Sequence, residues 1–215
     1  MFYKFTYTRF VSLNTIVIIK SIKIMKKIIF FIGILTVLSF AKVEVFNKNM
    51  SVIIVPESKL QIRGNSNINK FKCDFNVLEI KNPIPLFYEQ KENKIYFKKA
   101  TLALRNSCFD CGSRGINKDF HKLLKSNKFP QIFLNLKEIE KKDNIIEASV
   151  EMIIAGISKT YKLPVEIEGD DSLLVSGVLN LNISDFNLKA PKKLLGLIVV
   201  SENIEIDFNL VIKEI

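Results

Sequence analysis

The sequence predicts an all-β protein, an eight-stranded antiparallel barrel with one short helix, preceded by a signal peptide. Apolar and polar residues alternate through most of the chain, which is typical of strands with one buried face and one solvent-exposed face. The connections between these segments are short, which favours antiparallel pairing of neighbouring strands. A single segment has its apolar residues at helical spacing.

The N-terminal region has the organisation of a signal peptide. Met25 is followed by two lysines and the apolar run IIFFIGILTVL, and Ser39 and Ala41 occupy the −3 and −1 positions of a cleavage site. The stretch from Ile28 to Ala41 spans about 14 residues, whereas a membrane-spanning helix needs roughly 20. An uncleaved membrane anchor is the alternative.

This segment divides the chain into three parts. Because Met25 opens a complete signal by itself, we expect residues 1–24 to be an upstream extension and residues 25–41 to be the signal peptide. Residues 42–215 are then the barrel domain, periplasmic or secreted after cleavage near Ala41. The full chain carries +10, but residues 42–215 contain 26 basic and 22 acidic residues, a net charge of only +4. The main argument for nucleic-acid binding is thereby lost.

Eight segments have the strand pattern. The clearest is the last, in which Ile204, Ile206 and Phe208 alternate with Glu205 and Asp207. The predicted strands are residues 60–62, 68–80, 94–105, 131–139, 144–156, 157–169, 172–184 and 203–212.

A barrel of eight strands has a narrow interior. Closing the sheet removes its edges, and the interior is then filled by side chains or holds one small ligand, as in lipocalins. A two-sheet sandwich is the alternative that periodicity leaves open. In the second strand Phe71, Cys73 and Phe75 share a face, and we expect them to point inward.

The predicted helix lies between the third and fourth strands. Asn117 is a candidate N-cap, Phe120 and Leu124 have helical spacing, and Pro130 closes the segment. His121, the chain's one histidine, lies on this helix. We expect a surface or half-buried residue there, not a catalyst.

The three cysteines, Cys73, Cys108 and Cys111, allow one disulfide and leave one thiol over. An exported protein favours such a bond, and the sequence leaves all three pairings open. Cys108 and Cys111 have redox-motif spacing, but Cys108 lies in a loop and not at the helix N-terminus that would lower its pKa.

No catalytic or metal-binding residues are predicted. A Ser-His-Asp triad would have to use His121 on a polar helix, and the strand carboxylates fall on the solvent faces. Glycine-rich phosphate loops are absent from the sequence, and the cysteines and the histidine lack zinc-site spacing. We therefore expect a protein that is not an enzyme.

Four segments, in this order, resemble the YceI-like family of exported bacterial proteins. The resemblance extends over about residues 51–215. The chain departs from many members in lacking Trp and in having Asn67 after Ser66 where those members have a His-Ser pair, so it resembles a divergent branch. The segments are SKLQIRGNSNINKFKC (58–73), GINKDFHKLLKSNKFPQIFLNL (115–136), IIAGISKTYKLPVEI (153–167) and DFNLKAPKKLLGLIVVSENIEIDFNL (185–210).

The resemblance implies a lipocalin-like barrel whose interior binds a long polyisoprenoid chain, such as a quinone tail, and export to the periplasm. It also implies that Cys73 and Cys111 pair and that Cys108 stays free. A bound isoprenoid lipid or quinone is the one cofactor-like molecule expected. Transient membrane contact, for which Lys192 and Lys193 are candidates, and a homodimer remain open.

We therefore expect an exported protein that binds or carries a lipophilic, polyisoprenoid ligand without chemistry. The alternative is a solid barrel that acts as an envelope interaction or stress-related protein and holds no ligand. In the carrier, apolar residues of the inner strand faces line the ligand, and Phe186, in the loop before Pro191, guards one mouth. The expected ligand-binding residues are Phe71, Phe75, Leu134, Val150, Met152, Ile154, Leu179, Leu181, Phe186, Ile206 and Phe208.

Overall fold

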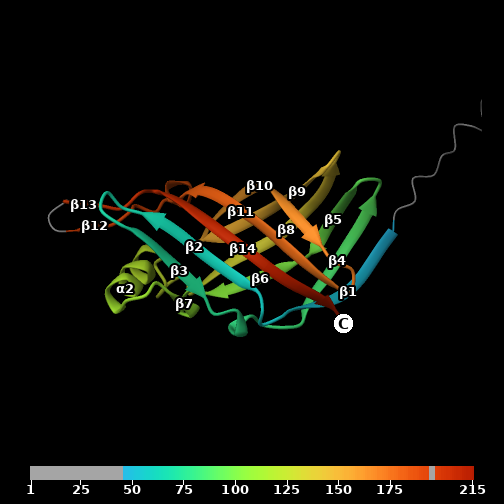
Figure 1. Cartoon of the computed structure of the whole chain (residues 1–215), viewed down its shortest axis with the longest axis horizontal. Helices are drawn as coiled ribbons and strands as arrows, with labels where there is room; N and C mark the ends of the chain where they lie inside the picture. The colour runs from blue at the N-terminus through green and yellow to red at the C-terminus, as the bar shows by residue number, and fades with distance from the viewer. Residues whose placement is uncertain (1–45, 194–196) are drawn as a thin grey trace, which may run out of the picture. The chain divides into compact units, whose positions relative to one another are not determined.

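The computed structural model describes residues 46–193 and 197–215, which form an antiparallel twelve-stranded sheet, a separate two-stranded sheet and one α-helix (Figure 1). The described residues belong to one unit, Val45–Ile215. The expected upstream extension and signal peptide, residues 1–41, lie outside the described residues. The predicted all-β antiparallel class with one helix is confirmed for the part that the structure describes.

The strands are β1 (Phe46–Ile54), β2 (Lys59–Asn65), β3 (Lys70–Phe75), β4 (Ile84–Lys91), β5 (Lys94–Lys99), β6 (Thr101–Arg105), β7 (Phe109–Asp110), β8 (Gln131–Lys142), β9 (Ile145–Ile154), β10 (Ile157–Glu168), β11 (Ser172–Asn182), β12 (Lys192–Lys193), β13 (Ile198–Val199) and β14 (Asn203–Glu214). The helices are the α-helix α2 (Arg114–Leu123) and the 3-10 helices η1 (Val77–Glu79), η2 (Asn106–Cys108) and η3 (Ile183–Phe186).

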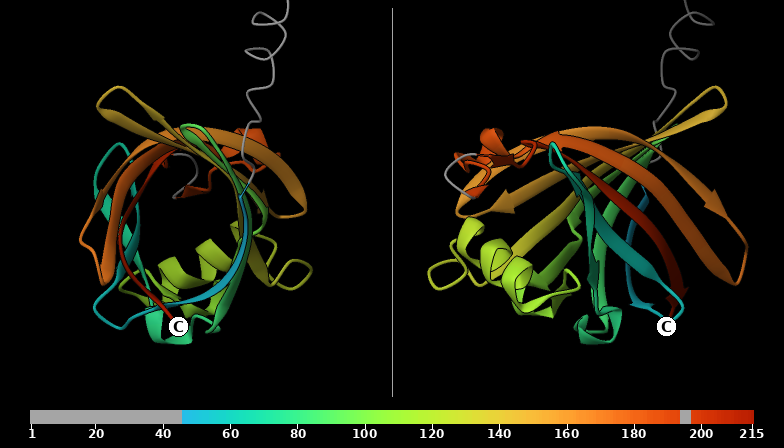
Figure 2. Two further views of the ribbon diagram at one scale, coloured as in Figure 1. Left: turned by 90° about the vertical axis from the view of Figure 1, so that its right-hand side faces the viewer. Right: turned by 60° about the vertical axis from the view of Figure 1, so that its left-hand side comes forward.

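Eight of these strands form a hydrogen-bonded ring. Their order is β1-β4-β5-β8-β9-β10-β11-β14, and β14 also pairs with β1, for example at Ile212 opposite Ile54. Figure 2 (left) looks along this ring and shows the strands surrounding an interior, with α2 beyond it. The predicted total of eight strands is too low, because the large sheet has twelve.

One edge of β14 is divided between two partner strands, and further strands outside the ring continue from one of them. Residues 205–209 of β14 pair with β2, and residues 212–214 pair with β1. From β2 the sheet continues through β3 to β7. Strand β8 is shared in the same way, with β6 opposite residues 131–135 and β5 opposite residues 138–140. At one end of the ring, β2 and β6 therefore take the places that β1 and β5 hold at the other end.

The strands β1 and β4 are absent from the prediction. The sequence NPIP suggests a break, but Ile84 begins β4 and Pro85 lies opposite Ser51 of β1. Pairing of β4 with β5 begins only at Phe87, so Pro85 lies where β4 has a single strand partner. A proline is tolerated at such an edge because a missing N–H costs no ladder bond there.

Three further boundaries differ from the prediction. The second predicted strand ends at Phe75, because Asn76 caps η1 by accepting from the Leu78 backbone N–H. The third is divided at Ala100, whose carbonyl accepts from the Leu136 N–H at 2.9 Å. Residues 192–193 belong to the short strand β12, which pairs with β13.

The helix begins four residues earlier than predicted. Ser113, not Asn117, is the N-cap, and its side chain accepts from the Ile116 N–H at 3.3 Å. Asn117 lies inside α2 and accepts from the Cys111 N–H at 2.6 Å. Ser caps a helix as well as Asn does. The spacing of the apolar residues does not distinguish these two caps, so the helix start was predicted too late.

Candidate functional site

The candidate site is the inner face of the ring. In an antiparallel sheet, residues directly opposite each other share a face. Met152 on β9 lies opposite Leu134 on β8, and Leu179 on β11 lies opposite Ile206 on β14. All four belong to, or pack against, one apolar cluster inside the ring.

The outer face of β9 is polar. Glu151 accepts hydrogen bonds from Asn135 (3.0 Å) and Ser158 (2.8 Å), and its carboxylate lies 2.8 Å from the Lys137 ammonium. Lys137 first, and then the two hydrogen bonds, lower the pKa of Glu151 to about 2. The carboxylate therefore stays ionised on the outer face of β9. The inner face of the same strand is apolar.

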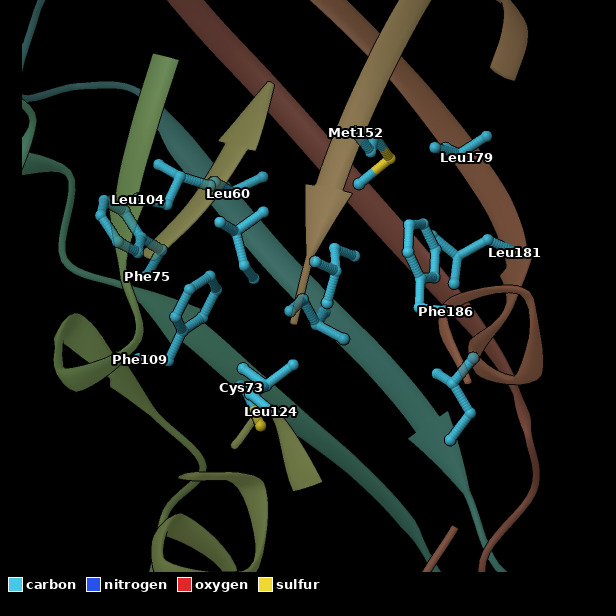
Figure 3. Close-up of a cluster of buried hydrophobic side chains, with 14 of the residues drawn as sticks. Leu60, Cys73, Phe75, Leu104, Phe109, Leu124, Met152, Leu179, Leu181 and Phe186 are labelled. Atoms are coloured by element: carbon cyan, nitrogen blue, oxygen red, sulfur yellow. The ribbon is translucent and has the colours of Figure 1, made fainter. Parts of the chain in front are cut away.

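The half of the interior next to α2 is closely packed. Phe186 has no exposed surface, and Cys73 and Met152 are 1% and 2% exposed. The rings of Phe75 and Phe109 meet edge to face with their centroids 4.9 Å apart. Figure 3 shows these side chains converging from several strands. This half is a solid core in the structure.

A disulfide and α2 close the same end. Cys73 on β3 is bonded to Cys111, the pair that the family resemblance implies, and Cys108 is a half-buried free thiol. The Phe120 ring of α2 lies 5.2 Å from the Phe109 ring. The disulfide joins β3 to the segment just before α2, and so holds the helix at this end.

A short helix fills a gap between two strands of the ring. Strand β10 pairs with β11 only at residues 166–168, so its first half has no β11 partner. There the Tyr161 hydroxyl donates to Asp185 of η3 at 2.9 Å, and the rings of Tyr161 and Phe186 are 6.1 Å apart. Burial, followed by the bond to Asp185, raises the pKa of Tyr161. Phe186 thus lies inside the wall of the ring and not at a mouth.

The other half of the inner face is partly exposed. Ile139 lies opposite the buried Ala148, and Val175 lies opposite Leu210, so these side chains point inward. They lie toward the turns at residues 92–93, 143–144 and 169–171, away from α2. All members of this set are half buried. They are Leu86, Ile95, Phe97, Ile139, Ile146, Val150, Ile167, Val175, Leu210 and Ile212.

The structure brings ten of the eleven predicted ligand-binding residues together. Phe71 is the exception, because its ring lies over Gly64 and it is not among the described residues that pack on the cluster. The buried members are Phe75, Met152, Ile154, Leu179, Leu181 and Phe186. The half-buried members that pack against them are Leu134, Val150, Ile206 and Phe208.

Sequence reasoning missed most of the half-buried set. The predicted residues come mainly from the parts of the strands nearest α2, whereas Phe97, Val175 and Leu210 lie nearer the far turns. Alternation identified the inward face of β11 and β14 but carries no information on depth along the ring. The unrecognised strand β4 supplies Leu86.

Within residues 46–193 and 197–215, no three His, Cys, Asp or Glu side chains are grouped so that they could hold a metal ion. No helix in this part of the chain has the length and apolar character needed to cross a membrane.

The chain is similar to solved structures of the same fold. BcnA from Burkholderia cenocepacia is 17% identical, with a TM-score of 0.55 over 72% of this chain and 96% of that one. A polyisoprenoid-binding domain from Saccharophagus degradans, implicated in plant cell wall breakdown, is 13% identical, with a TM-score of 0.58 over 76% of this chain and 98% of that one. No curated protein matches the chain in sequence.

The family assignment rests on more than fold. The model of the YceI-like domain matches residues 57–212. This range includes all four segments that carry the sequence resemblance, and it extends over more than half of the chain. The protein therefore belongs to the YceI-like family, as those segments predict.

Proposed function

We propose that the ring acts as a lipocalin-like barrel that binds an elongated apolar molecule in its interior and carries it without chemistry. The observation that supports this is the half-buried inner face, where Phe97, Ile139, Val175 and their neighbours point inward yet keep exposed surface. Covering such surface with an apolar chain is favourable by about 25 cal/mol per Å². A protein that needed only a solid core would bury these side chains against one another.

The ligand class that we propose is a polyisoprenoid, such as a quinone tail or polyprenol. Its repeating apolar units need no polar partner, and unpaired polar groups inside the ring would cost about 1–3 kcal/mol each. The domain from Saccharophagus degradans, which has the same fold, is named for binding a polyisoprenoid. The partly exposed set extends over β4, β5, β8, β9, β10, β11 and β14, which suits a long ligand.

We also propose export to the periplasm with cleavage near Ala41. The sequence pattern of residues 25–41 supports this, and the bond between Cys73 and Cys111 suits an oxidising compartment.

The test is the lipid content of protein purified without detergent. The full chain is expressed for export, recovered from the exported fraction and extracted with organic solvent for mass spectrometry. Val175→Trp fills the inner face, and Val178→Trp is its matched control, because Val178 lies on the same strand and is 43% exposed on the outer face. We expect a stoichiometric isoprenoid lipid in the parent and in the control, and a several-fold loss in Val175→Trp.

The opposite result favours the solid barrel, an envelope interaction protein without a ligand. That alternative draws on the close packing of Met152, Leu179 and Phe186 next to α2. A folded parent protein that yields an empty extract, and that stays empty after quinones and polyprenols are offered, would overturn the carrier proposal.

A further inference from the structure

The outer surface of α2 and the turn after it is strongly basic. Residues 114–128 contain five Lys or Arg and one acidic residue, a net charge of +4. This equals the net charge of all of residues 42–215, so the rest of that range is neutral overall. The net positive charge of residues 42–215 is therefore concentrated in residues 114–128.

These cations line a shallow hollow of about 670 Å³ together with His121. No carboxylate lines the hollow, and the one acidic residue of the segment, Asp119, lies outside its lining. The lining cations are Arg114, Lys118, Lys122, Lys125 and Lys128.

Five cations lie together in this hollow, whereas several lysines on the sheet lie beside a carboxylate. On the sheet, Lys94 pairs with Glu138 and Lys142 with Glu140, at 3.2 and 2.9 Å. With a net charge of +4, the segment that carries the hollow can attract an external anion.

The array is held in place by the other face of the helix. Phe120 packs on Phe109, and Leu124 is buried in the apolar cluster. His121 contacts the Asn106 carbonyl at 3.1 Å, and Cys111, just ahead of the helix, is fixed by its disulfide. The backbone that carries the cations is therefore fixed before they bind, so it adds no ordering cost of its own.

Exposed apolar side chains lie at the same end of the ring. Ile116 on α2 is 40% exposed, and Leu197, beside β13, is 74% exposed. Figure 1 places α2 and the β12–β13 hairpin at the same end, and the turns that follow β4 and β8 at the other. Those distant turns contain acidic residues, Glu92 and Asp143 among them. Exposed apolar side chains also occur at those turns, for example Ile145 at 60%, so it is the positive charge that distinguishes the α2 end.

We propose that the α2 end docks on an anionic phospholipid membrane, with the cations of the hollow contacting lipid phosphates and Ile116 entering the interface. Basic clusters next to exposed apolar side chains bind such surfaces, each cation contributing about a fivefold gain in affinity. Docked in this way, the protein directs the turns at the opposite end away from the membrane. The proposal is independent of what the ring holds.

The test is flotation of the protein with vesicles of phosphatidylcholine, with or without 30% phosphatidylglycerol. The protein is the full chain recovered from the exported fraction. The first variant, Lys118→Ser/Lys122→Ser/Lys125→Ser, removes three charges from the hollow. Its control, Lys81→Ser/Lys141→Ser/Lys213→Ser, removes three charges from exposed lysines away from α2.

We expect binding to the anionic vesicles only, about 100-fold weaker in the first variant and nearly unchanged in the control. Raising the salt concentration should weaken it, because exposed charges are screened. Circular dichroism checks folding, and the single change Lys122→Glu supplies a second variant of the hollow.

Equal binding to neutral vesicles, or equal loss in both triple variants, would overturn the proposal. So would binding of inorganic phosphate without binding of vesicles, which would make the hollow a small-anion site.

Discussion

The Tyr161 hydroxyl donates a hydrogen bond to Asp185 at 2.9 Å, and this bond ties η3 to the half of β10 that has no β11 partner. With Phe186 fully buried beside it, the contact completes the wall of the ring where two strands separate.

Removing that hydroxyl should loosen the wall. We expect Tyr161→Phe to lower the free energy of unfolding by about 1 kcal/mol, because a hydrogen bond to a carboxylate is lost while the ring stays. Urea unfolding measures the change. Tyr96→Phe, on an exposed tyrosine, is the control and should stay within about 0.5 kcal/mol of the parent. An equal loss in the control would contradict a structural role for the bond.

Phe186 should matter more to stability than a half-buried phenylalanine. We expect Phe186→Ala to cost about 3–5 kcal/mol, because its ring is fully buried and leaves a cavity. Phe71→Ala should cost clearly less, because Phe71 lies outside the core cluster. Chemical denaturation of both variants gives the comparison, and equal costs would show that the burial of Phe186 has been misassigned.

Because Phe71 packs over Gly64, the effect of a substitution at residue 64 on stability should depend on the side chain at residue 71. A Cβ at residue 64 would lie 2.8 Å from Phe71 Cε2, closer than real contacts allow. We expect Gly64→Ala to destabilise the fold by about 1–3 kcal/mol through overpacking. In a Phe71→Ala background the same change should be neutral or stabilising. A double-mutant cycle measures this coupling, and simple additivity would rule out the steric explanation.

The disulfide should contribute substantially to stability. Cys73 and Cys111 are separated by 38 positions, and closing a loop of this length stabilises by about 4 kcal/mol in the chain-entropy model. We expect Cys73→Ala/Cys111→Ala to lower the unfolding free energy by about 2–4 kcal/mol. Cys108→Ser should have little effect, and a reducing agent should reproduce the double variant. Loss of stability in Cys108→Ser instead would indicate a different pairing.

Glu151 should make the fold sensitive to acid. Its pKa is about 2 in the fold, against an ordinary value of 4.5, so its stabilising effect is present above pH 4.5 and is lost as the pH falls toward 2. We expect Glu151→Gln to cost up to about 1 kcal/mol at pH 7 and to converge with the parent at low pH. Urea unfolding at pH 7 and pH 2 tests this. Glu166→Gln, on an exposed residue, should show no such convergence.

Periodicity predicted the fold class well and the strand total poorly. The last strand shows why it succeeds, since the apolar residues from Ile204 to Leu210 alternate with polar residues and form β14 as expected. It fails where a strand carries prolines, as β4 does at Pro85, or polar residues at its start, as β1 does at Asn47 and Lys48. In such strands pairing with neighbours, not local preference, decides the structure.

The sequence predicted which face of each strand lines the candidate site, but not which residues along the strand stay partly exposed. Alternation placed Met152 and Leu179 on the inner face, and both point there. It could not show that they are buried while Val175 and Phe97 stay partly exposed, because depth along the ring depends on how the strands are staggered. The pairing of Cys73 with Cys111 came from the family resemblance, since the chain spacing alone allowed three arrangements.

The divided edge of β14 has a consequence for how this protein folds. Strand β14, the last of the ring, pairs with β11 and β2 and also with β1, the first strand of the ring. Contacts between segments so far apart in the chain raise the contact order, which slows folding. The ring cannot close until β14 itself has emerged from the ribosome or the translocation pore. Until then β1 and β2 have edges that need protection from aggregation.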